Sequence, residues 1–240
     1  DVTNLERFGL MIRNSENASY NYHKQMVSSG NAWSTSDGQQ MLWDAERTPV
    51  TMIAYAPYMS EAAPDASLVV NALTNQTTEE NVKSSDFLLM KATVDPEQDL
   101  TADGKLKISL SHAMSKLLIK ITVNGTTDAA MNKLGDMSIN GAVVNGICDL
   151  SATVPIVVPA PDAVVATVAP YKGTESCECI LPPQKIVEGF SVNFSYDGKL
   201  YIWTAKEAIE LEKGVEHTLT LNLNTTVRLA AKMARNWATG

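Results

Sequence analysis

The sequence lacks the long apolar runs, the positive charge and the cysteine framework that define several large classes of protein. No run approaches the roughly 18 consecutive apolar residues that a membrane-spanning helix requires. The net charge of −8 excludes a surface built to bind nucleic acid. Helical periodicity is weak throughout. Hydrophobic residues still make up 45% of the 240 residues, which is enough for a core in one large β domain or two of ordinary size.

The cysteines are few, and their spacing does not suggest a disulfide scaffold. Cys177 and Cys179 lie two residues apart on an expected strand, so their side chains point the same way, which is poor geometry for a bridge. We expect them and Cys148 to be buried thiols that act as small apolar side chains. A bridge from Cys148 to either of the others stays open. The histidines have no zinc-finger spacing, so we expect no metal and no other cofactor.

The stretch 181–223 predicts antiparallel strands from end to end. Apolar residues alternate there with polar ones, and this period of two is typical of strands buried on one face. Asp197-Gly198 is a two-residue turn signal, so the strands on either side of it are predicted to form a hairpin. Residues 205–213 fit either a helix or an edge strand. Further strands are expected at residues 50–57, 86–90, 106–110 and 117–123.

A shift in composition marks a domain boundary near Gly104, where the acidic segment 95–104 ends. We therefore predict an all-β chain with an N-terminal domain of residues 1–104 and a C-terminal domain of residues 105–240. The carboxylates of this segment, Asp95, Glu97, Asp99 and Asp103, loosely suggest a calcium-binding loop. Leu100, however, stands where an EF-hand needs glycine, and no glutamate closes the loop, so a solvated linker is expected.

No catalytic constellation stands out, so we do not expect an enzyme. His112 lies among serines, but Ser109 and Ser111 alternate with core residues on the outer face of a strand. No Gly-x-Ser-x-Gly elbow is present, and a structural histidine is expected instead. Paired carboxylates for glycoside hydrolysis cannot be recognised in the sequence, because their separation is a spatial property.

Aromatic residues beside loops provide an alternative function from another class, a monomeric surface lectin. Tyr20, Tyr22 and Trp33 flank loops and are the candidate glycan contacts. The alternative for each of them is packing against the protein itself.

Six short regions, in order along nearly the whole chain, resemble the fimbrillin-like proteins of Bacteroidales, which are subunits of surface pili. Each is a few residues of strand or turn, so their common order carries the resemblance. The regions are Leu5-Glu-Arg-Phe-Gly9, Trp43 with Val50–Tyr58, Ser85–Leu89, Leu110–Leu117, Leu181–Gln184 with Leu211–Thr218, and Asn236–Gly240.

The resemblance implies two tandem transthyretin-like Greek-key β-sandwich domains and a structural or adhesive subunit of a cell-surface fimbria. It also implies an exported lipoprotein, held at the outer membrane by a lipid on a cysteine upstream of this chain. The expected partners are other pilus subunits, in a homopolymer or a heteropolymer, and a host glycan or protein receptor. The sequence begins with Asp1 and shows no leader, so we expect a mature or trimmed chain.

In the assembly scheme of that family, proteolysis removes an N-terminal strand and the open groove takes a strand from the next subunit. Residues 226–237 suit this donor role, because one row of an extended strand there is apolar. The alternative is that the segment is the last strand of its own domain. The candidate donor residues are Val227, Leu229, Ala231, Met233 and Trp237.

Overall fold

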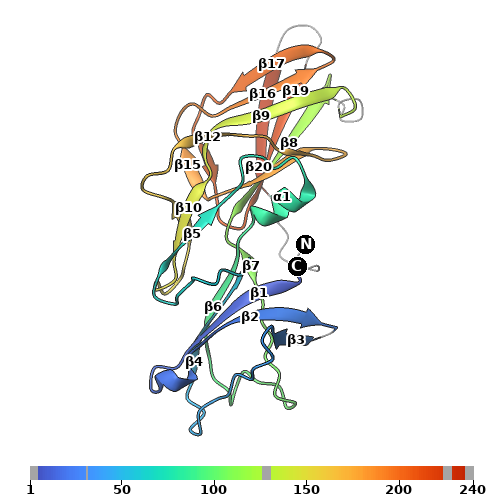
Figure 1. Ribbon diagram of the computed structural model, residues 1–240. Coiled ribbons are helices and arrows are strands. Elements are labelled where there is room, and N and C mark those ends of the chain that lie inside the picture. Colours follow the sequence, from blue (N-terminus) through green and yellow to red (C-terminus); the bar gives the residue numbers. More distant parts are fainter. Residues whose placement is uncertain (1–4, 31, 126–130, 224–228, 236–240) are drawn as a thin grey trace.

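The computed structural model describes residues 5–30, 32–125, 131–223 and 229–235, the last of these by its backbone alone. The chain forms two stacked lobes (Figure 1). Residues 5–56 and 88–112 build the first lobe, and the remaining described residues build the second. Strands dominate both lobes, which confirms the expected all-β class. In the described part of the chain, no helix has the length and apolar character of a membrane span.

The described first lobe is built on one sheet of six strands in the order β3-β2-β1-β4-β6-β7. Neighbouring strands in this sheet are antiparallel. A short 3-10 helix, η2 (Ala18–Tyr20), connects the first two strands. The strands are β1 (Arg7–Arg13), β2 (Tyr22–Ser29), β3 (Ala32–Thr35), β4 (Val50–Ala56), β6 (Leu88–Val94) and β7 (Ser111–His112).

Two larger sheets form the sandwich of the second lobe, in the orders β12-β9-β16-β17 and β13-β14-β8-β19-β20. Two smaller sheets, β11-β10-β5 and β15-β18, and the helix α1 (Glu79–Ser84) accompany them. The strands are β5 (Ser67–Asn71), β8 (Ser115–Val123), β9 (Leu134–Val143), β10 (Asn145–Asp149), β11 (Val157–Pro159), β12 (Val165–Val168), β13 (Tyr171–Lys172), β14 (Cys177–Leu181), β15 (Gln184–Ile186), β16 (Ser191–Tyr196), β17 (Lys199–Thr204), β18 (Ile209–Leu211), β19 (Glu216–Leu223) and β20 (Leu229–Arg235).

The predicted hairpin is confirmed in β16 and β17, which are antiparallel partners from Ser191↔Thr204 to Tyr196↔Lys199. Asp197 and Gly198 both have positive φ, 49° and 74°. A type I′ turn, one of the two that follow the twist of the strands, needs positive φ at both central positions, and Asp-Gly is a favoured dipeptide there. Residues 205–213 contain an edge strand, β18, and not a helix.

Two elements differ from the sequence prediction. Residues 106–110 were expected to be a strand, but they form only an isolated bridge from Leu106 to Leu100. The helix α1 was not predicted, although Thr78 caps it by accepting a hydrogen bond from the Asn81 backbone nitrogen, and Glu79 and Glu80 occupy its first turn. These are ordinary helix-start signals in a segment too short to show a helical period.

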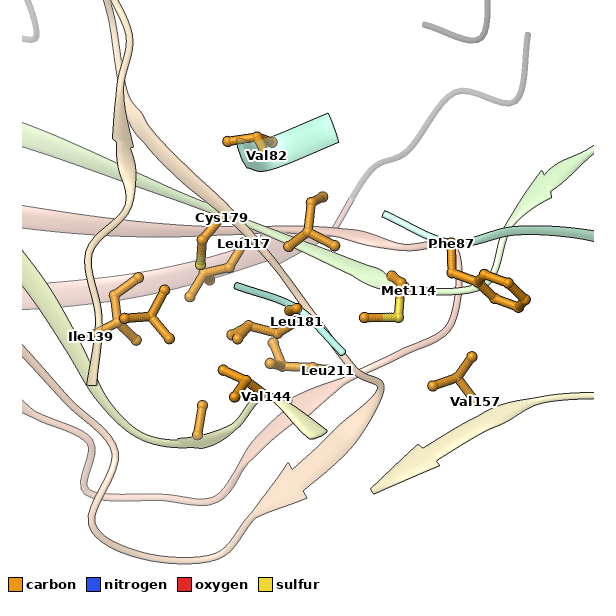
Figure 2. Close-up of a cluster of buried hydrophobic side chains, with 14 of the residues drawn as sticks. Val82, Phe87, Met114, Leu117, Ile139, Val144, Val157, Cys179, Leu181 and Leu211 are labelled. Atoms are coloured by element: carbon orange, nitrogen blue, oxygen red, sulfur yellow. The ribbon is translucent and has the colours of Figure 1, made fainter. Parts of the chain in front are cut away.

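The core of the second lobe gathers side chains from nearly every element (Figure 2). Leu117 of β8 and Cys179 of β14 come from one large sheet, and Ile139 of β9 comes from the other. Val82 reaches the same cluster from α1. All three cysteines are buried and free, which confirms their expected role as small apolar side chains.

The two lobes share this hydrophobic cluster. Met11, Ile53, Tyr55 and Leu89 of the first sheet belong to it, on the face that meets the second lobe. The smaller sheet pairs β5 with β10, and so joins residues from both sides of Gly104. The domain boundary near Gly104 stays a prediction.

Candidate functional site: an apolar groove in the first lobe

One face of the first sheet is apolar and meets no second sheet in the described chain. Phe8, Leu10 and Ile12 of β1 alternate with Gly9 and Met11, so they share a face of the sheet. Residues of β2 and β4 extend that face on either side. The apolar cluster here consists of Phe8, Leu10, Ile12, Met26, Val50, Met52, Ala54, Ala56, Leu88 and Val94.

Two irregular segments, 36–49 and 95–110, cover this face where a sandwich has its second sheet. Met41 and Trp43 come from the first of them, and Leu106, Ile108 and Leu110 come from the second. All five are only partly buried. The two segments are the walls of the site.

Between the walls lies a groove with a volume of about 710 Å³. Its floor is β1 with the adjoining parts of β2 and β4, and its lining is mostly apolar. Trp33 of the edge strand β3 packs edge-on against Phe8, with ring centroids 4.8 Å apart, and stays 42% exposed. A groove of this volume and apolar lining can accept apolar side chains of a ligand.

The first wall is held in place by hydrogen bonds from the sheet. The hydroxyl of Tyr22 donates to the Leu42 carbonyl at 3.2 Å and accepts from the Leu42 amide at 3.1 Å. Asn14, which is 3% exposed, donates from Nδ2 to Asp44 Oδ2 at 2.7 Å. Hydrogen bonds from Thr48, and then the one from Asn14, hold the pKa of Asp44 below its usual range. The wall is therefore in place before any ligand arrives.

The second wall contains a strand-like segment without a ladder. Leu106, Ile108 and Leu110 are partly buried and Lys107 and Ser109 are exposed, which is the period of a half-buried strand. Residues 107–110 nevertheless have no ladder partner among the residues that the structure describes. Their backbone groups are free to pair with a strand that enters the groove.

The structure places the aromatic candidates at this groove. Tyr20 and Trp33 are part of its lining. Tyr22 instead anchors the first wall through its hydroxyl. The sequence analysis did not single out the floor residues of β1 as a site. Their only signal was the short apolar run 8–12, which any buried strand shows.

The donor candidates lie at the other end of the chain. Leu229, Ala231 and Met233 belong to β20, which pairs with β19 of the same chain at Leu223, Leu221 and Leu219. Among the described residues, β20 is an outer strand of its sheet, with β13 at the opposite edge. Val227 and Trp237 lie outside the described residues.

His112 has a structural environment. Its Nδ1 donates to Asp86 Oδ2 at 2.6 Å, which ties β7 to the residues just before β6. A second cavity of about 550 Å³ lies beside this pair. The other carboxylate oxygen of Asp86 is buried within the described structure.

Comparisons with known proteins identify the class of protein. The sequence profile of the fimbrillin-like family matches residues 3–235, nearly the whole chain. The chain therefore belongs to the fimbrillin-like family, and the resemblance read from its motifs is confirmed. The expected role as a structural subunit of a fimbria is confirmed with it. A search of curated proteins found no match.

Solved structures share the fold. A candidate cell adhesion protein from Bacteroides uniformis is similar with a TM-score of 0.72 at 17% identity, covering 95% of this chain and 90% of that one. A second candidate, from Bacteroides ovatus, has a TM-score of 0.69 at 17% identity and covers 95% and 85%. The tip fimbrial protein Mfa3 from Porphyromonas gingivalis, with a C-terminal truncation, has a TM-score of 0.56 at 9% identity and covers 97% and 94%. At these identities the likeness shows the fold alone.

Proposed function

We propose that this chain joins its fimbria by strand donation and that the groove of the first lobe is the acceptor site. The observation that carries the proposal is the combination of an apolar floor beneath the groove with the strand-like residues 107–110 of the second wall, which have no ladder partner among the described residues. An entering strand buries alternate side chains against Phe8, Leu10 and Ile12. Its backbone completes a ladder along 107–110. This is strand addition with pockets for every second side chain.

The energetics suit a stable joint. Each large apolar side chain that becomes fully buried contributes about 1.5–3 kcal/mol, so three of them contribute roughly 5–9 kcal/mol before ordering costs. Ordering costs are lower when the acceptor is preformed. The bonds from Tyr22 and Asn14 to the first wall support such a preformed acceptor.

The proposed donor is the C-terminal segment, with Leu229, Ala231 and Met233 as its inward row. In the free chain these residues pair with β19. Because β20 is an outer strand, its transfer breaks only its ladder with β19. The acceptor offers another ladder along 107–110. Val227 and Trp237 extend the same proposed donor segment.

The finer parts of the family resemblance belong to the same proposal. They are two transthyretin-like sandwiches in tandem, a lipid anchor upstream of the chain at the outer membrane, and a host glycan or protein receptor. The fimbrillin-like family is a family of structural proteins, and we propose that this chain has no catalytic role.

A binding experiment tests the acceptor role. A peptide with the sequence of residues 226–240, added to the full chain, is expected to bind and to raise its Tm. Replacing Leu229 and Met233 of the peptide with aspartate is expected to abolish both effects, because charged groups cannot enter the apolar floor.

Two tryptophan variants of the full chain locate the binding site. Ala32 is exposed and lines the groove, so Ala32→Trp is expected to fill it and block the peptide. Ala208 is exposed in the second lobe, and Ala208→Trp is the matched control, expected to leave binding intact. Equal binding by both variants would show that the peptide binds elsewhere and would contradict the proposal.

A further variant, Trp33→Ala, addresses the lectin alternative. If a glycan array finds a defined ligand for the chain and Trp33→Ala abolishes its binding, Trp33 serves a glycan and not only a strand. Peptide binding that survives in this variant would then separate the two functions.

A further inference from the structure

The second cavity, with a volume of about 550 Å³, is lined by residues of both lobes. Its first-lobe side consists of residues 5–7 with single residues of β2, β4, β6 and β7. Its second-lobe side consists of residues 57 and 58, Lys83 of α1 and Asp86 just beyond that helix. Cavities of about 300–1,000 Å³ are typical of sites for small ligands, so this one is large enough for a binding site.

Two cations at this cavity have no counter-ion in the described part of the chain. Arg7 begins β1 and Lys83 lies in the last turn of α1, and both are exposed to solvent. The cavity also has two acids, but Asp86 already accepts a hydrogen bond from His112 Nδ1 at 2.6 Å. Among the described lining residues, Glu6 alone is left to offset the two cations, so the cavity suits an anionic ligand. An arginine side chain can bind a carboxylate through two parallel hydrogen bonds.

Two neutral polar side chains at the cavity also lack a hydrogen-bond partner among the described residues. Gln25 of β2 and Tyr58 are both partly buried, and no other described residue binds the Gln25 amide or the Tyr58 hydroxyl. The Tyr58 ring lies against that of His23, with ring centroids 5.5 Å apart, so packing sets its position. An amide and a hydroxyl each both donate and accept, so this pair matches a ligand that carries hydroxyl groups.

The rest of the lining is apolar. Leu5, Ala56, Pro57 and Leu88 contribute side chains without polar atoms, and Ala56 and Leu88 are buried. The C–H groups of a sugar ring can pack against such a surface while its hydroxyl groups reach the polar side chains. Apolar, neutral polar and cationic groups therefore converge on one cavity, which is the composition of a site for a small polar ligand.

We propose that this cavity between the lobes binds a saccharide unit that carries a carboxylate. Arg7 and Lys83 bind the carboxylate, and Gln25 and Tyr58 exchange hydrogen bonds with the ring hydroxyls. A neutral sugar leaves the two cations without an anion, and a simple anion leaves the two neutral groups without hydroxyls. The inference rests on the glycan receptor proposed above, and gives it a chemical class and a place apart from Trp33. It does not depend on strand donation.

The test titrates the full chain with four small molecules and follows binding by ligand-observed NMR. Glucuronic acid and N-acetylneuraminic acid combine a carboxylate with hydroxyl groups, glucose has only the hydroxyls, and acetate has only the carboxylate. At least one of the two acidic sugars is expected to bind about tenfold more tightly than glucose or acetate, the gain of about one additional hydrogen bond to a charged group. The acidic sugar that binds identifies the kind of saccharide.

Substitutions in the cavity locate the binding site. Arg7→Gln and Lys83→Gln each remove one cation, and each is expected to weaken binding of the acidic sugar about tenfold and to leave that of glucose unchanged. Gln25→Ala is expected to weaken binding of the acidic sugar and of glucose alike, because both present hydroxyls. Lys185 is exposed in β15 and does not line the cavity, so Lys185→Gln is the matched control and is expected to bind as the native chain does.

Three results would overturn the proposal. They are that neither acidic sugar binds, that acetate binds as tightly as the acidic sugars, or that the two cation variants bind the acidic sugar as tightly as Lys185→Gln does. The cavity variants are expected to bind the peptide of residues 226–240 as the native chain does, so none of these results bears on strand donation. A native chain that binds the sugar but not the peptide would contradict the acceptor role alone.

Discussion

Gly9 lies directly against the ring of Tyr55, so closely that a Cβ atom at residue 9 would overlap Cζ, Cε1 and the hydroxyl of that ring. The two residues are register partners in β1 and β4. Tyr55 is fully buried and belongs to the cluster that the two lobes share. Glycine at residue 9 is therefore a requirement of the contact between the lobes.

Gly9→Ala is expected to lower the free energy of unfolding by about 1–3 kcal/mol, as overpacked cores do. Urea unfolding followed by circular dichroism measures the loss. In a Tyr55→Ala background the ring is gone, and Gly9→Ala is expected to cost much less. Equal costs in both backgrounds would show that the ring does not set the requirement.

Lys91 connects the lobes through its ammonium group. From β6 it donates to the carbonyls of Leu150, Ser151 and Ala152 in the second lobe, at 2.8, 3.2 and 2.9 Å. Lys91→Met removes these bonds and is expected to cost about 1.5–3 kcal/mol of unfolding free energy, typical of hydrogen bonds to a charged group.

Thermal and urea unfolding of the Lys91→Met variant measure this cost. Lys185 is exposed in β15, so Lys185→Met is the control and is expected to stay within about 0.5 kcal/mol of the native chain. A Lys91 variant as stable as this control would contradict the role of the ammonium group.

His23 makes stability depend on pH. The Tyr55 hydroxyl donates to the Met59 carbonyl at 2.9 Å, because a carbonyl only accepts, so His23 Nε2 donates to the hydroxyl at 2.7 Å. Burial also raises the pKa of Tyr55 to about 12, which keeps this hydroxyl protonated. Burial lowers the pKa of His23 below its ordinary value of 6.5.

The unfolded chain therefore binds the His23 proton more readily than the folded chain. The contribution of neutral His23 to the free energy of unfolding is fully present above pH 6.5, the ordinary pKa of histidine. This contribution is lost as the pH falls from 6.5 toward the lower pKa of His23 in the folded chain. Urea unfolding of the native chain and of His23→Asn is measured between pH 8 and pH 5. The difference between their free energies of unfolding isolates the pH-dependent contribution of His23, since the other histidines are common to both. A stability difference that does not change with pH would contradict the assignment.

The thiols are expected to be inert in the folded chain. Burial raises the pKa of Cys148 and of Cys177 to about 11, and that of Cys179 rises as well. Since the thiolate is the reactive form, a disulfide reagent at pH 8 should label none of them before unfolding and all three after it. Absorbance of the released group counts the thiols. Rapid labelling of one thiol in the folded chain would show an opening at that residue.

Local patterns predicted much of the fold. The alternation in 190–196 and the Asp197-Gly198 turn led to a hairpin that the structure contains, because both signals act between residues close in sequence. In 106–110 the same alternation correctly indicated which side chains face inward. It did not indicate whether a neighbouring strand is present. A ladder needs a partner, and no local pattern specifies one.

The groove was beyond sequence analysis for a similar reason. Its floor comes from residues 8–12, one wall from 36–49 and the other from 95–110. The aromatic pattern drew attention to Tyr20 and Trp33, but it did not indicate whether their rings face a glycan or a groove. What the rings of Tyr20 and Trp33 face depends on which segments of the folded chain lie opposite these two residues.

The amino-acid order by itself determined the all-β class, the hairpin and the family motifs, since each depends on side chains a few residues apart. Only the tertiary structure decided that one sheet face stays without a second sheet and that the lobes share a core through Tyr55 and Gly9. Both depend on residues that are tens of positions apart, whose contacts form only when the whole chain packs.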